Sequence, residues 1–131
     1  MASPFGKDLD ETFMRKALVQ AWYAFKRDEV PVGAVVVDSH GVIIGRGYNQ
    51  VERFHTQAAH AEMIALKKAG AFLGDWRLLG CWLYVTLEPC AMCYYAAVLS
   101  RCAGIIFGAS SPLFGYQGVD NEGPLQLYKE N

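Results

Sequence analysis

The sequence predicts an α/β domain, in which helices cover both faces of a sheet. Two runs rich in β-branched residues, 32–37 and 42–44, are nearly continuously apolar, as in strands that are buried on both faces. Segments with helical periodicity alternate with strand-like segments along the chain. Because 131 residues is the length of one domain, we expect residues 1–131 to fold as a single unit.

The first predicted element is a helix over residues 10–27. Its apolar residues recur every four positions, with two more beside them: Phe13, Ala17, Ala21, Phe25, Met14 and Leu18. This spacing is typical of a helix with one buried face. We expect Asp10 to be its N-cap, and Pro31 prevents the helix from continuing.

A hairpin, a loop and a second helix are predicted next. The strands 32–37 and 42–44 are joined by a short polar link that contains glycine, which indicates a hairpin. Residues 45–56 are polar and contain glycine, which predicts a loop. Residues 60–69 contain strong helix formers, and Gly70 is expected to end this helix.

The second half of the chain predicts strands over residues 81–86 and 103–107. Between them lies a predicted helix over residues 90–100, with Pro89 at an allowed position before its first turn. Residues 125–127 alternate between apolar and polar, which indicates one last strand. The helix between these strands has no polar face, so it needs cover on two sides. The sheet can cover one side, and the other faces either the rest of the domain or a second subunit.

Composition and charge exclude several classes of protein. With 53% apolar and 19% charged residues, the chain is not intrinsically disordered. A net charge of −1 excludes a polycation that grips nucleic acid by bulk charge. The sequence has neither an apolar run long enough to cross a membrane nor the apolar core of a signal peptide in its first ten residues. We therefore expect a cytoplasmic protein with no membrane partner.

The four cysteines are Cys81, Cys90, Cys93 and Cys102. Without a secretion signal, metal binding or free thiols are favoured over disulfides. Cys90 and Cys93 are three residues apart at a predicted helix start, which places both sulfurs on one side and favours thiolates. His60, at the start of the preceding helix, can supply a third ligand. Three protein ligands leave a fourth position for water on a tetrahedral zinc, as in catalytic sites. Cys81 and Cys102 lie in apolar strands and are expected in the core.

Glu62 is the candidate proton carrier of this site. It follows His60 by two residues, and at a helix start it can still point into the same cavity. Zinc lowers the pKa of a bound water toward about 7, and Glu62 could pass the proton of that water to a ring nitrogen or a leaving amine. Alone, a Cys-x-x-Cys pair is often redox-active or structural, and a His-x-Glu pair is often surface decoration. Their combination at two helix starts favours a catalytic site.

Asn49 lies in the predicted loop and has two readings. Its amide can donate and accept at once, which suits the edge of a nucleobase. Asn also favours turns for its own backbone hydrogen bonding, so the sequence leaves both readings open. His40 and His55 also lie in predicted loops, where we expect them to face solvent.

Two motifs together, His60-Ala61-Glu62 and Pro89-Cys90-Ala91-Met92-Cys93, resemble the signature of the cytidine/deoxycytidylate deaminase superfamily. Within it, the chain is similar to the bacterial tRNA-specific adenosine deaminases. The stretches that carry this similarity are 29–34, 45–49, 59–62, 83–93 and 107–109. They span roughly residues 10–110, most of the chain.

The resemblance implies a three-layer α/β/α sandwich with a mixed five-stranded sheet, and a homodimer. It implies hydrolytic deamination of adenosine to inosine at the wobble position of a tRNA anticodon loop, where a single-stranded base can be flipped out. The site residues it implies are the Zn²⁺ ligands His60, Cys90 and Cys93, the catalytic Glu62, and the substrate-binding residues Asn49, Val32, Leu87 and Pro89.

The chain departs from the pattern of this family in three places. Residues 56–58 are Thr-Gln-Ala where the family has Asp-Pro-Thr, and residues 110–114 lack the family's Asp and Lys. The family's basic C-terminal helix has no counterpart before Asn131, so we expect a short or truncated C-terminal segment.

Because of these departures, two other functions are considered as alternatives. The first alternative is a deaminase of a free base or nucleoside (guanine, cytosine or cytidine), which suits a near-neutral chain. The second is a non-catalytic zinc-stabilised binding domain, which would have no need of Glu62. An RNA substrate would require a basic path for its phosphates. The candidates for that path are Arg46, Arg53, Lys67, Lys68, Arg77 and Arg101.

Overall fold

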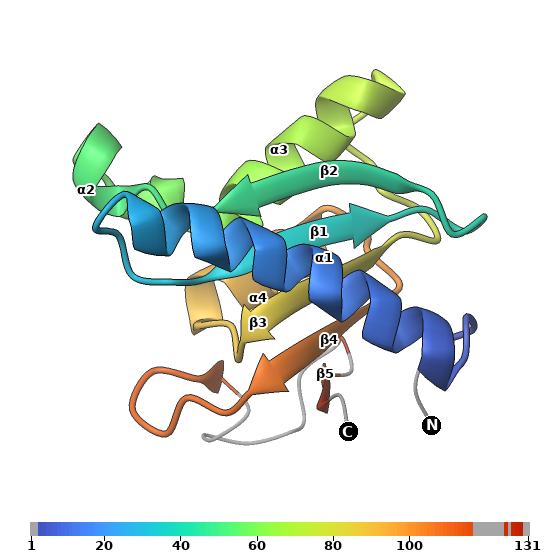
Figure 1. Cartoon of the computed structure of the whole chain (residues 1–131). Coiled ribbons are helices and arrows are strands. Elements are labelled where there is room, and N and C mark those ends of the chain that lie inside the picture. Colours follow the sequence, from blue (N-terminus) through green and yellow to red (C-terminus); the bar gives the residue numbers. More distant parts are fainter. Residues whose placement is uncertain (1–2, 117–124, 126, 130–131) are drawn as a thin grey trace.

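The computed structural model describes residues 3–116, 125 and 127–129. Within them, five strands form one mixed sheet in the order β2-β1-β3-β4-β5 (Figure 1). The strands are β1 (Gly33–Val37), β2 (Ile43–Tyr48), β3 (Trp82–Leu87), β4 (Gly104–Ala109) and β5 (Leu127–Lys129). β1 is antiparallel to β2 and β3, whereas β4 is parallel to β3 and β5.

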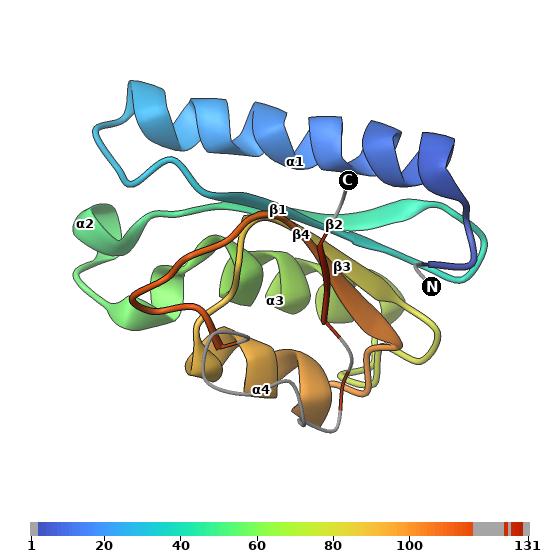
Figure 2. The same ribbon diagram turned by 90° about the horizontal axis from the view of Figure 1, so that it is seen from below.

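Helices cover both faces of this sheet. They are α1 (Lys7–Lys26), α2 (Val51–Phe54), the 3-10 helix η1 (Gln57–Ala59), α3 (Ala61–Leu73) and α4 (Ala91–Leu99). Figure 2 shows α1 alone on one face and α3 and α4 on the other, so the predicted three-layer α/β/α sandwich is confirmed. No helix among the described residues is both long enough and apolar enough to cross a bilayer.

Each face of the sheet has its own core. Phe13, Met14 and Ala17 of α1 pack against Val35 and Tyr84 on one face. The opposite core joins α3 and α4 to the other side of the same strands; its fully buried members include Val36, Ala65, Val85, Ala97 and Ile105. This second core fixes the starts of α3 and α4 relative to the end of β3.

The N-terminal end of α1 differs from the expectation. The helix begins at Lys7, so Asp10 lies inside it and the prediction that Asp10 is the N-cap was wrong. Asp10 is instead buried, and its carboxylate accepts hydrogen bonds from the hydroxyls of Ser3 and Tyr84. A buried carboxylate needs such donors, and this one attaches α1 to β3.

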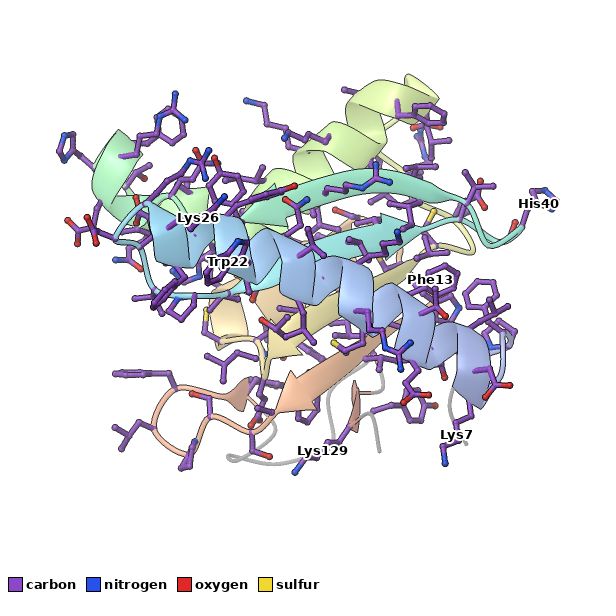
Figure 3. All side chains as sticks on the ribbon, viewed as in Figure 1. Lys7, Phe13, Trp22, Lys26, His40 and Lys129 are labelled. Atoms are coloured by element: carbon purple, nitrogen blue, oxygen red, sulfur yellow. The ribbon has the colours of Figure 1, made fainter. Side chains whose placement is uncertain are left out.

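The apolar face predicted for α1 was correct for four of its six residues, and Leu18 and Phe25 are the exceptions. A spacing of four residues turns by about 40° per repeat on a helix of 3.6 residues per turn, so the stripe leaves the sheet before the helix ends. Phe13 is buried, but Leu18 and Phe25 are 53% and 59% exposed. Ala24 is buried in place of Phe25. Of the α1 residues labelled in Figure 3, Phe13 is buried and Trp22 is 53% exposed.

Three other predicted element boundaries were also wrong. Residues 45–48, predicted as part of a loop, belong to β2, because Gly45 and Gly47 let α3 approach the strand closely. Gly70 does not end the second predicted helix, since α3 continues to Leu73 and ends at Gly74 with a φ of 68°. The strand predicted over 125–127 shares only Leu127 with β5.

Candidate active site

Three predicted metal ligands meet where α3 and α4 begin. His60 is the N-cap of α3, Cys90 is the N-cap of α4, and Cys93 lies in the first turn of α4. The Nδ1 atom of His60 is 3.3 Å from Sγ of Cys93 and 3.9 Å from Sγ of Cys90. The ligand atoms of all three residues lie within 4.8 Å of one another. Two motifs that are thirty residues apart in sequence thus form one cluster.

These distances fit zinc. A tetrahedral zinc at its usual bond lengths to one imidazole nitrogen and one thiolate holds those two atoms about 3.6 Å apart. The two observed nitrogen–sulfur distances, 3.3 and 3.9 Å, lie on either side of that value. One nitrogen and two sulfurs form a donor set that zinc prefers, and they leave a fourth tetrahedral position open to the cavity.

Without a metal, the cluster favours the thiolate form of Cys90 and the thiol form of Cys93. Hydrogen bonds from Cys93 and then from His60 lower the pKa of the Cys90 thiol to about 3, although partial burial opposes this. The pKa of His60 is raised, first because its ring hydrogen-bonds to Cys90. The pKa of Cys93 is raised, because it donates to the Cys90 sulfur and is buried. A bound metal cation would hold both sulfurs as thiolates.

Glu62 lies in the first turn of α3 with only 4% of its surface exposed. It lines the same cavity as His60 and Cys90. Burial raises the pKa of its carboxyl group, because the charged form loses solvation. A buried carboxyl beside the predicted metal ligands is placed to accept and return a proton.

The cavity has a volume of about 570 Å³, within the usual range for small-molecule sites. Its lining residues are Glu29, Val30, Val32, Asn49, Val51, Glu52, Gln57, His60, Ala61, Glu62, Leu87, Glu88, Cys90, Ser111 and Phe114. Three of the predicted substrate-binding residues, Val32, Asn49 and Leu87, are among them. Pro89 is not: its side chain is buried, and its carbonyl oxygen accepts a hydrogen bond from the Tyr116 N–H at 2.9 Å.

The position of Asn49 is compatible with both of its predicted roles, which are shaping the loop and contacting a nucleobase edge. Its Oδ1 accepts from the Val51 N–H at 3.3 Å, and its Nδ2 donates to the Val30 carbonyl at 3.4 Å, so it shapes the loop. An amide has two donor hydrogens and two acceptor lone pairs. One donor and one acceptor position of Asn49 are not used by these two bonds.

Two buried carboxylates in the cavity wall were not among the predicted site residues. Glu29 accepts from the backbone N–H groups of Glu52 and Arg53 at 3.0 and 2.9 Å, and so holds α2 at the cavity edge. Glu88 accepts from the Ser111 N–H at 2.9 Å and holds the loop that brings Phe114 to the cavity. A charged residue beside a proline at the end of an apolar segment is the signal in the sequence that could have found Glu88, whereas the neighbours of Glu29 carry no such signal.

The remaining candidates lie elsewhere. Cys81 and Cys102 are buried in the core, as predicted, but they lie just before β3 and β4 and not within strands. Burial raises the pKa of Cys102 to about 12. His40 and His55 are exposed, with His40 at the tip of the β1–β2 hairpin (Figure 3).

All six basic candidates for phosphate contact are exposed. Arg53 is the one on α2, next to the cavity, whereas Arg77 pairs with Asp75 at 3.1 Å.

Comparison with known proteins agrees with this geometry. The family model of the cytidine and deoxycytidylate deaminase zinc-binding region matches residues 7–109. The chain belongs to this deaminase family. The matched region is a zinc-binding one, and His60, Cys90 and Cys93 form a cluster that is positioned to hold the ion.

Relatives within the deaminase family include a tRNA-specific adenosine deaminase of Bacillus subtilis (strain 168). It is 48% identical over 110 residues, which are 84% of this chain and 68% of the relative. The chloroplastic tRNA(adenine(34)) deaminase of Arabidopsis thaliana is 48% identical over 112 residues, 86% of this chain. The chain thus spans about two thirds of the bacterial relative (68%) but only 8% of the plant relative.

Solved deaminase structures share the fold. One, from a study of A-to-I editing by tRNA:A34 deaminases at the wobble position of transfer RNA, matches with a TM-score of 0.84 and 39% identity. The match covers 91% of this chain and 97% of that chain. Guanine deaminase from Bacillus subtilis matches with a TM-score of 0.74 and 32% identity, covering 90% of this chain and 83% of its own.

Proposed function

We propose that this chain is a zinc-dependent hydrolase that deaminates adenosine to inosine at the wobble position of a tRNA anticodon loop. The observation that carries this proposal is the placement of the buried Glu62 beside the zinc ligands in a cavity of about 570 Å³. The similarity to tRNA-specific adenosine deaminases extends over 84% of the chain, which supports this choice of substrate.

In this reaction water adds to the carbon that carries the exocyclic amine, and the amine leaves as ammonia. Zinc, when bound, supplies a water made acidic enough to act as a hydroxide nucleophile near neutral pH. Glu62 would take one proton of the attacking water and deliver it to the adjacent ring nitrogen. It would then take the proton of the hydroxyl group added to the ring carbon and pass it to the amine, so that the carbonyl forms as ammonia leaves. Its burial keeps bulk water from competing for this proton.

The cavity walls suit a flat base. Val32 and Leu87 provide apolar surface for the ring faces, and Asn49 offers its unused donor and acceptor to the base edge. Phe114 also lines the cavity, yet it is 76% exposed. An aromatic ring placed there can stack on a nucleotide next to the target, as aromatic residues do in single-stranded RNA recognition.

A free base such as guanine is the second candidate substrate, and the similarity to guanine deaminase favours it. The zinc ligands and Glu62 would act in the same way on either substrate. The two functions differ at the cavity mouth, because only an RNA substrate must extend out of it toward Phe114 and Arg53.

The homodimer is also part of this proposal. Met92, Tyr95 and Leu99 of α4 are 40%, 41% and 65% exposed, so the helix presents apolar side chains away from the sheet. A second subunit would cover them. A single deaminase domain over residues 1–131 and the cytoplasmic location stay predictions.

The test is a panel of substrates offered to the zinc-loaded protein. It contains an anticodon stem-loop with one adenosine at the wobble position, the same stem-loop with that adenosine moved by one nucleotide, free adenosine, and free guanine. Inosine in the first stem-loop alone is expected. Turnover of guanine without inosine in either stem-loop would overturn the proposal and favour the second candidate.

A further inference from the structure

The imidazole ring of His60 makes a polar contact at each of its nitrogens. Nδ1 faces the sulfurs of Cys93 and Cys90 at 3.3 and 3.9 Å, and Nε2 lies 2.8 Å from Oε1 of Gln57. Nδ1 can bind a metal only if it carries no proton, so the ring proton must then be on Nε2. The Nε2–H group donates to the Gln57 carbonyl oxygen, and this hydrogen bond favours the tautomer that zinc requires.

The backbone holds Gln57 in the position for this bond. Gln57 begins η1, and the side chain of Thr56 caps that turn by accepting from the Ala58 N–H at 3.1 Å. The other end of η1 is tied to the start of α2, because the α2 N-cap residue Gln50 donates its N–H to the Ala59 carbonyl at 2.9 Å. The Gln57 side chain therefore reaches a ring three residues ahead from a short turn fixed at both ends.

We propose that Gln57 is a positioning residue for the zinc centre, which fixes the tautomer and the orientation of the His60 ring. Groups that accept from the second nitrogen of a zinc-bound histidine commonly raise metal affinity and activity by about 10- to 100-fold. The inference concerns the zinc site and holds whichever substrate the enzyme uses, so failure of the tRNA proposal would leave it standing.

Because the Gln57 amide is neutral, it accepts from the His60 ring without adding a charge beside the zinc centre. Zinc with two thiolates and one neutral imidazole has no net charge. A carboxylate at position 57 would still accept from Nε2, but it would add a negative charge beside the centre. Gln57→Glu should therefore keep zinc bound at least as tightly, because it keeps the acceptor and attracts the cation.

Zinc affinity, measured by competition with a chromophoric chelator, tests this inference directly. Gln57→Leu keeps the size of the side chain and removes the acceptor, and Gln57→Asn keeps the amide but shortens its reach. Both should weaken zinc binding by about 10- to 100-fold. Gln57→Glu should bind zinc at least as tightly as the parent protein. The cobalt-substituted protein gives a second readout, since a reoriented imidazole should alter its visible absorption in the Leu and Asn variants only.

Thr56→Val is the matched control, because it removes the cap of the same turn without touching the ring. It should lower the melting temperature and, because the Gln57 acceptor is still present, weaken zinc binding by less than Gln57→Leu does. The inference is overturned if Gln57→Leu binds zinc as the parent does. It is equally overturned if Thr56→Val weakens zinc binding as much as Gln57→Leu does, or if Gln57→Glu binds zinc as weakly as Gln57→Leu. A change in KM alone for Gln57→Leu would also overturn it, because that result would indicate a direct contact with the substrate.

Discussion

Gly47 of β2 lies directly against Ala61 of α3. A Cβ atom on Gly47 would be 2.5 Å from the Ala61 carbonyl oxygen, a separation that backbone atoms cannot accept. Ala61 stands between His60 and Glu62, so the absence of a side chain at Gly47 sets the depth of the zinc site. We predict that Gly47→Ala lowers the free energy of unfolding by about 1–3 kcal/mol and weakens zinc binding.

Gly70→Ala is the control for that prediction. Gly70 lies inside α3, where the nearest atom to an added Cβ is 3.4 Å away, an ordinary contact. This replacement should stabilise the protein by about 0.5–1 kcal/mol through helix propensity and leave zinc content unchanged. Thermal unfolding and elemental analysis of the two variants measure both effects. Equal stability of Gly47→Ala and the parent would contradict the account of this contact.

Glu62→Gln should abolish turnover and spare the metal. Its amide keeps the size of the side chain but cannot carry the proton, so kcat should fall by at least about 100-fold. Zinc content should stay at that of the parent, because Glu62 is not a ligand. Glu52→Gln, on the exposed edge of the same cavity, is the comparison and should change kcat little. An active Glu62→Gln variant would remove Glu62 from the mechanism.

Removal of zinc should make Cys90 reactive and leave the core cysteines unreactive. In the metal-free site Cys90 is partly exposed with a pKa lowered to about 3, so iodoacetamide should alkylate it rapidly after chelation. Cys81 and Cys102 should stay unlabelled, since both are buried and burial raises the pKa of each. Peptide mass mapping before and after chelation measures this. Labelling of Cys102 in folded, chelated protein would contradict the buried core described here.

Phe114→Ala should weaken the binding of RNA more than that of a free nucleoside. Loss of one base–aromatic stacking contact costs about 1–3 kcal/mol, which corresponds to roughly a 5- to 150-fold higher KM for a stem-loop. Leu113→Ala is the neighbouring control, because Leu113 is 86% exposed and does not line the cavity. Steady-state kinetics of both variants on the stem-loop separates them. Equal effects of the two substitutions would exclude stacking as the role of Phe114.

The zinc site could be predicted from the sequence because its ligands come in two short motifs. Cys90 and Cys93 are one helical turn apart, and a histidine two residues before a glutamate at another helix start completes the set. Local geometry decides such spacings, so little of the tertiary structure had to be known. The α/β class was predictable for a similar reason, since continuous apolar runs indicate strands buried on both faces.

The errors arose where tertiary packing decides. Gly45 and Gly47 suggest a loop by composition, and only the approach of α3 makes them part of a strand. Asp10 is a good N-cap by type, but its burial against Tyr84 cannot be inferred from its neighbours in sequence. Gln57 shows the same limit within the site, because its contact with His60 depends on a short 3-10 turn over residues 57–59 that the sequence analysis did not predict.

The measurement that tests the central claim most directly is sequencing of a tRNA with a wobble adenosine after incubation with zinc-loaded protein. Inosine is copied as guanosine, so each edited position can be identified. We predict conversion of the wobble adenosine alone by the parent protein, and none by a Glu62→Gln variant with the same zinc content. No conversion at any adenosine by fully zinc-loaded parent protein would contradict the assignment of this chain as a tRNA adenosine deaminase.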